Sequence, residues 1–107
     1  KGIFSLDDSK FHEIVDNEFF LIEDRLDQLE LDVDINASGG VLTLSFSNAS
    51  SIVLSRQVAN HEIWVAAKSG GFHLRRVGHI WYCDSTGESL KQVLNRVFME
   101  QSSEAAF

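Results

Sequence analysis

The sequence has no proline and only one cysteine, Cys83, among its 107 residues. A single cysteine excludes a disulfide within the chain and a zinc cage built from several cysteines. It fits a reducing compartment, so we expect a cytoplasmic protein. No apolar run reaches the roughly 18–20 residues of a membrane-spanning helix, so we expect no membrane partner. The length and a hydrophobic content of 44% predict one domain over residues 1–107.

Basic residues are scarce where acidic residues are dense. Residues 7–34 contain eleven acids but only two bases, Lys10 and Arg25, whereas the rest of the chain has five acids and seven bases. This polarity argues against nucleic acid, whose phosphates require a positive surface. It favours cations or a basic protein surface as partners. A solvated acidic face is the usual interpretation of such a run, but solubility alone does not require the charges to be segregated.

Hydrophobic periodicity predicts a helix at each end of the chain. Apolar residues recur every three or four positions from Phe11 to Leu29, which indicates a helix over about residues 7–29. Ser5 and Asp8 resemble a capping box for this helix. Phe20 and Leu21 fall outside its apolar stripe, so we expect one of them to be partly exposed.

The second helix follows a predicted capping box and carries a second apolar stripe. Ser89 and Gln92 form the capping box, and the stripe extends from Leu90 to Phe98. The polar residues 101–107 should fray, as chain ends commonly do.

Alternation of apolar and polar residues predicts six strands between these helices. They cover residues 33–36, 41–46, 51–57, 62–68, 72–77 and 80–84. Their connections are too short for crossovers, so the sheet should be antiparallel. Two terminal helices can cover one face of such a sheet. The predicted fold is therefore α+β, a two-layer α/β sandwich of α-β(5-6)-α order with the other sheet face open to solvent.

The sequence lacks the motifs of covalent catalysis. Cys83 lies between apolar neighbours, where free cysteines are usually buried and inert. Neither a Gly-x-Ser-x-Gly elbow nor a Gly-rich phosphate loop is present. We therefore expect a protein that is not an enzyme, without an activated nucleophile.

Two groups of acidic residues could bind a metal ion. Residues spaced by four lie in one row on a helix, and the first such row is Asp8, His12 and Asp16. The second group combines the helix with the strand after it: Glu23, Asp27, Asp32 and Asp34. Carboxylates with an occasional imidazole suit Fe²⁺, Mn²⁺, Co²⁺ and Ca²⁺. Because a Glu-x-x-His repeat and an EF-hand loop are absent, any such site should be exposed and weak.

The predicted sheet has one candidate for a binding anchor. Trp64 follows Ile63, so the two side chains face opposite sides of the sheet. If the helices cover the Ile63 side, Trp64 stands on the open face beside Arg56 and Gln57, where an exposed Trp and Arg are typical binding anchors. Burial of Trp64 is equally consistent with the pattern until the register is known. The remaining histidines, at positions 61, 73 and 79, are interpreted as surface residues.

Several segments resemble the frataxin family in its bacterial, CyaY-type form. They are IEDRLD (22–27), SGGVLTLSF (38–46), RQVANHEIWVAAKSGGFH (56–73) and WYCDSTGESL (81–90). The strand that carries Gln57, Ile63 and Trp64 is the most specific of them. The chain departs from the family pattern at Ala59, where a proline is usual, and at residues 28–29, where acidic or aromatic residues are usual.

The resemblance implies a role in iron–sulfur cluster assembly. In the family, carboxylates of the first helix and strand form an acidic ridge that binds Fe²⁺ and Fe³⁺ weakly, and Co²⁺ or Mn²⁺ can substitute. This ridge docks on a basic surface of the cysteine desulfurase, while the sheet with its Trp faces the scaffold protein. Carried over by position, the ridge is Glu23, Asp24, Asp27, Glu30, Asp32 and Asp34. The resemblance adds Asp8 and His12 as a second metal corner.

The expected function is iron-dependent inhibition of the desulfurase, or donation of iron to the scaffold. We expect a monomer by default, which iron can drive into oligomers. The expected partner-binding residues are Glu23, Asp24, Asp27, Arg56, Gln57 and Trp64. Two alternatives remain open: a ferroxidase or iron-storage oligomer, and an acidic interaction adaptor with no metal role.

Overall fold

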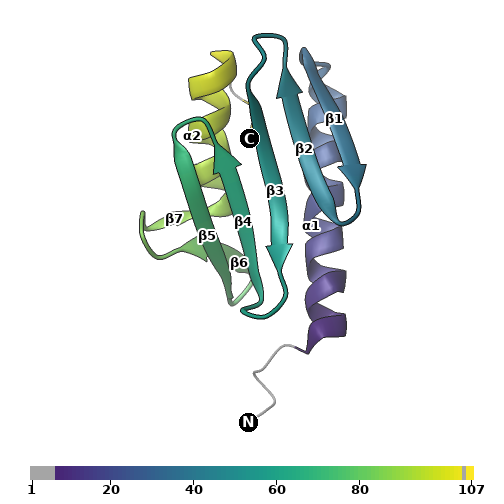
Figure 1. The fold of residues 1–107 in the computed structure, drawn as a ribbon, viewed down its shortest axis with the longest axis vertical. Helices are drawn as coiled ribbons and strands as arrows, with labels where there is room; N and C mark the ends of the chain where they lie inside the picture. Colours follow the sequence, from purple (N-terminus) through teal and green to yellow (C-terminus); the bar gives the residue numbers. More distant parts are fainter. Residues whose placement is uncertain (1–6, 105) are drawn as a thin grey trace.

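The computed structural model describes residues 7–104 and 106–107. A helix at each end of the chain flanks one antiparallel sheet of seven strands, hydrogen-bonded in sequence order. The helices are α1 (Asp8–Leu29) and α2 (Leu90–Ser102). The strands are β1 (Val33–Ser38), β2 (Val41–Phe46), β3 (Ser51–Gln57), β4 (Glu62–Ala67), β5 (Gly70–Val77), β6 (Ile80–Cys83) and β7 (Glu88–Ser89). Both helices lie on the same side of the sheet, which confirms the predicted two-layer α+β sandwich (Figure 1).

The seventh strand was not predicted. It consists of two residues, Glu88 and Ser89, which pair with Cys83 and Tyr82 of β6. A segment this short shows no alternation, so hydrophobic periodicity cannot detect it. The other six strands lie at the predicted positions, with small differences at their ends.

Helix α1 begins two residues later than the predicted capping box implies. Its N-cap is Asp7, whose carboxylate accepts a hydrogen bond from the Lys10 backbone N–H at 2.7 Å. Asp8 is therefore the first helical residue and not the third, so the capping box of Ser5 and Asp8 is wrong. Ser5 itself lies outside the described residues. An acidic N-cap stabilises the helix because it accepts a hydrogen bond from a backbone N–H that would otherwise be unpaired. Its negative charge also lies near the positive end of the helix dipole.

The apolar stripe of α1 forms one side of the core. Phe11, Val15, Ile22 and Leu26 are buried against the sheet residues that face the helices, including Leu44. The stripe leaves Phe20 and Leu21 outside, and both are exposed, by 60% and 51%. Burial of one face thus fixes which α1 side chains remain in solvent.

The end of the chain is packed, not frayed as predicted. The capping box of Ser89 and Gln92 is present at the start of α2, as expected. At its other end, Gln101 is only 5% exposed, and its side chain accepts a hydrogen bond from the Lys68 N–H and donates to the Ser51 carbonyl. The amide thus joins α2 to two turns of the sheet, which a local sequence pattern cannot reveal. No helix in residues 7–104 has the length and apolar character to cross a membrane.

Candidate cation and partner site

The acidic ridge combines the second half of α1 with the beginning of β1. Ile22 and Leu26 point into the core, which leaves the acids between them on the outer side of the helix. In β1, Val33 and Ile35 face the helices, so Asp34 points away from them. All ridge carboxylates except the half-buried Glu23 are exposed: Asp24, Asp27, Glu30, Asp32 and Asp34.

The ridge carboxylates have no cationic partner within the described part of the chain. Every ion pair found there lies elsewhere, as in the pairs of Arg75 with Asp84 and of Arg96 with Glu88. The basic residue inside the ridge, Arg25, donates from Nε to the Ala106 carbonyl at 3.0 Å. Asp24 accepts a hydrogen bond from the neutral Gln28 amide. The ridge is therefore a surface of uncompensated negative charge.

The ridge does not form a closed metal cage. In residues 7–104 and 106–107, no three Asp, Glu, His or Cys side chains lie close enough together to hold an ion. Carboxylate oxygens suit Fe²⁺, Fe³⁺ and Mn²⁺ chemically. The geometry therefore suits an ion that keeps much of its water and contacts one or two carboxylates. The metal role of these residues remains a prediction.

The first row of predicted ligands contacts other side chains of the protein itself. Asp8 lies 2.8 Å from Nε2 of His61. Arg56 approaches both other members of the row: its Nη1 is 3.0 Å from Nδ1 of His12 and its Nη2 is 2.8 Å from Asp16. The predicted grouping of these three residues on one helix face agrees with these contacts. The sequence interpretation missed both His61 and Arg56 as their partners.

Arg56 lies on the opposite side of the sheet from its predicted position. It pairs with Ile63, whose side chain is fully buried under the helices, so the two share that side. The expectation that Arg56 stands beside Trp64 on the open face is therefore wrong. The sequence did contain the signal: Ile52, Leu54 and Arg56 alternate along one strand, and the first two are core residues.

The open sheet face carries Trp64 and Gln57, as expected. Trp64 is half-buried, stacks on His73 with ring centroids 4.3 Å apart, and donates from Nε1 to Glu62 at 2.9 Å. Gln57 pairs with Glu62 and so lies on the same face. An aromatic stack on an open sheet face is a surface of the kind that anchors protein interfaces.

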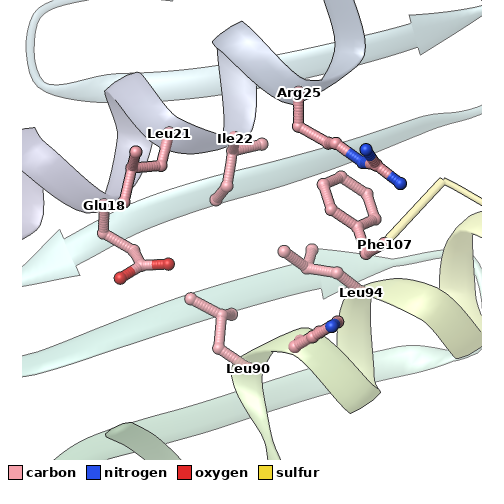
Figure 2. Close-up of a pocket in the computed structure, with 8 residues that line it drawn as sticks. Glu18, Leu21, Ile22, Arg25, Leu90, Leu94 and Phe107 are labelled. Carbon is pink, nitrogen blue, oxygen red and sulfur yellow. The ribbon is translucent and has the colours of Figure 1, made fainter. Parts of the chain in front are cut away.

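An apolar groove lies on the other side of α1 from the ridge. It separates α1 from α2, has a volume of about 420 Å³, and is lined by Leu21, Ile22, Leu90, Leu94 and Phe107 (Figure 2). Glu18 lies at its edge, where burial raises the pKa of that carboxyl and the Arg76 charge partly opposes the rise. None of the ridge carboxylates lines the groove, although Arg25 does.

The fold and surface define a class of protein: a two-layer α/β sandwich with an unpaired acidic ridge on its first helix and edge strand. Residues 4–104 match the model of the frataxin-like domain, and the chain belongs to the frataxin-like family.

Two curated relatives carry the name iron-sulfur cluster assembly protein CyaY. The protein of Stutzerimonas stutzeri (strain A1501) is 47% identical over 94% of each chain. That of Azotobacter vinelandii (strain DJ) is 43% identical over 94% of this chain and 93% of its own. Among solved structures, frataxin from Psychromonas ingrahamii has a TM-score of 0.90 at 29% identity, covering 94% of this chain and 96% of its own. Trimeric frataxin from Saccharomyces cerevisiae has a TM-score of 0.72 at 25% identity, covering 85% and 80%.

Proposed function

We propose that this protein acts in iron–sulfur cluster assembly in the cytoplasm, as a non-enzymatic, iron-binding regulator of a cysteine desulfurase. Membership of the frataxin-like family and the names of its relatives support the process. The observation that carries the mechanism is the contrast between paired and unpaired acids. Asp8, Asp16, Asp84 and Glu88 each contact a basic side chain, whereas the ridge carboxylates contact none in the described residues.

The ridge would act through electrostatics. Neighbouring carboxylates repel one another and gain free energy when they share a cation. Fe²⁺ or Fe³⁺ would bind there as cargo through one or two carboxylates and water, and Co²⁺ or Mn²⁺ could take its place. The same negative surface would dock on a basic surface of the desulfurase. Because an ion on the ridge changes the potential that the partner meets, iron and desulfurase binding should be thermodynamically linked.

The open sheet face would contact a second partner, the scaffold protein. Trp64 and Gln57 lie there, separate from the ridge. A ferroxidase would need a paired-iron site, but no group of three suitable ligands exists in the described ranges. Regulation of the desulfurase is therefore the function that the site supports best. In a second form of this function, the protein would donate iron to the scaffold.

A cluster-assembly assay with desulfurase and scaffold, run across Fe²⁺ concentrations, tests this function. We expect the wild-type protein to change the rate of cluster formation in an iron-dependent manner. The variant Glu23→Lys, Asp24→Lys, Asp27→Lys should lose desulfurase binding, and the effect of the wild type should weaken as salt screens the charges.

A matched control separates the ridge from net charge. The exposed acids Glu13, Glu100 and Glu104 lie outside the ridge, and converting these three to lysine changes the net charge by the same amount. We expect this variant to retain binding. If the ridge variant still binds and regulates, or if both variants lose binding equally, electrostatic docking through the ridge is wrong.

A further inference from the structure

Arg56 is a nearly buried cation that joins three elements. Its side chain is 12% exposed and leaves β3 on the helix side of the sheet. Nε donates to the Gly40 carbonyl at 3.2 Å, at the turn between β1 and β2. The other two guanidinium nitrogens contact His12 and Asp16 of α1. The guanidinium carbon lies 5.3 Å from the centre of the Phe19 ring, within the range of a cation–π contact.

These contacts occupy the one lone pair that His12 could offer to a metal. A guanidinium group has only N–H donors, so Nδ1 of His12 must accept in its 3.0 Å contact with Arg56. A neutral imidazole has a single accepting nitrogen, and the other nitrogen then carries the proton. Nε2 of His12 is therefore protonated and cannot ligate a metal, while the Nδ1 lone pair already accepts from Arg56.

The positive charge of Arg56 also opposes metal binding at His12 and Asp16. Asp16 accepts from Nη2 at 2.8 Å, so its negative charge is compensated by the protein. A divalent ion that approached Asp16 and His12 would meet a fixed positive charge within a few ångströms. Like charges at such distances repel, and water around the 68%-exposed Asp16 side chain screens part of this repulsion. Asp8, the third member of the row, is held by His61, which stacks on Phe11.

The turn between β1 and β2 leaves space for the Arg56 side chain. A side-chain carbon added at Gly40 would lie 3.3 Å from Nε of Arg56, which is closer than most Cβ atoms lie to a neighbouring atom. The neighbouring Gly39 has open space around the same position. Glycine at position 40 thus leaves room for Arg56, which a larger residue would displace by a few tenths of an ångström.

We propose that Arg56 is a resident cation that excludes metal ions from His12 and Asp16, while His61 holds Asp8, and so confines the ions to the ridge. Arg56 thus determines where metal ions bind, because its guanidinium occupies the position between His12 and Asp16 that an ion would otherwise take. The proposal rests on the proposed function only in taking the ridge as the place where ions do bind.

Paramagnetic Mn²⁺ tests this proposal in ¹⁵N-labelled protein near pH 7.5. His12 lies about 16 Å along the helix from Glu23, the nearest ridge residue, so broadening at the two places can be resolved. In the wild type we expect signals of residues 23–34 to broaden while the His12 ring signals persist. In Arg56→Gln, the His12 signals should broaden at a Mn²⁺ concentration at least about tenfold lower than in the wild type.

The outcomes separate the two proposals. Arg56→Lys keeps the charge and should remain close to the wild type. If His12 broadens together with the ridge in the wild type, or if Arg56→Gln changes nothing, exclusion by Arg56 is wrong while ridge binding stands. If the ridge itself does not respond to Mn²⁺, metal binding under the proposed function fails instead.

A second measurement needs no variant and applies even if Arg56→Gln does not fold. Long-range ¹H–¹⁵N spectra of the histidine rings report which nitrogen carries the proton. We expect the ring proton of His12 on Nε2, because Nδ1 accepts from Arg56. A proton on Nδ1 would mean that Arg56 does not donate to it, and would overturn the proposal.

Discussion

Substitution of two neighbouring glycines tests the position of Arg56 through its effect on the free energy of unfolding. Gly39 and Gly40 form the turn between β1 and β2 and both have positive φ, +62° and +79°. Alanine at either position should cost about 1–2 kcal/mol for the left-handed backbone. Alanine also reduces the conformational entropy of the unfolded chain. This effect on stability is similar at Gly39 and Gly40, so it cancels when the two substitutions are compared.

The difference between the two substitutions isolates Arg56. Only at Gly40 does the added carbon meet Arg56, and the same guanidinium bonds the Gly40 carbonyl. A hydrogen bond to a charged group is worth about 1.5–3 kcal/mol. Because Arg56 must shift by only a few tenths of an ångström, the bond is weakened and not lost, and Gly40→Ala should be about 0.5–1.5 kcal/mol more destabilising than Gly39→Ala.

Urea unfolding followed by tryptophan fluorescence gives both free energies, provided that the m-value is unchanged. In an Arg56→Gln background the two alanine substitutions should cost nearly the same, because the contact is gone. Equal costs in the wild-type background would refute the placement of Arg56 under the helix.

Three further substitutions test separate contacts. Glu18→Gln should raise stability at pH 7 by up to about 0.5 kcal/mol, because burial raises the pKa of Glu18 and penalises its charge; the gain should vanish as the pH falls and Glu18 takes up its proton. Glu88→Gln should lower stability by less than about 1 kcal/mol at pH 7, because its hydrogen bond with Arg96 lowers the pKa of Glu88; this loss should disappear as the pH falls through that lowered pKa. Gln101→Leu should cost about 2–3 kcal/mol in urea unfolding, since it leaves the Lys68 N–H and the Ser51 carbonyl without their partner. A loss of stability in Glu18→Gln, a gain in Glu88→Gln or a neutral effect of Gln101→Leu would contradict the contact that the substitution tests.

Local periodicity predicted most of the fold and the exposure of the ridge. The apolar stripe of α1 placed Ile22 and Leu26 in the core, which leaves the acids between them in solvent. Alternation in the strands placed Ile63 and Trp64 on opposite sides of the sheet. These features follow from helix and strand geometry alone, so a sequence is sufficient to predict them.

The errors concern contacts between distant segments. Gln101 is buried because it bonds to turns that are about fifty and thirty-three residues away in the chain, and no local pattern encodes such a contact. The partners of Asp8 and Asp16 come from β3 and the turn after it, forty or more residues away. The side of the sheet that Arg56 occupies was predictable from alternation, but its polarity favoured assignment to the open face.

Anaerobic titration of ¹⁵N-labelled protein with Fe²⁺ tests the central claim most directly. We expect amide signals of residues 23–34 to change first and the open sheet face around Trp64 to remain unchanged. The variant Glu23→Lys, Asp24→Lys, Asp27→Lys should lose the response, and the charge-matched variant of Glu13, Glu100 and Glu104 should keep it. An unchanged spectrum of the ridge, or an equal response in both variants, would contradict the assignment of iron to this surface.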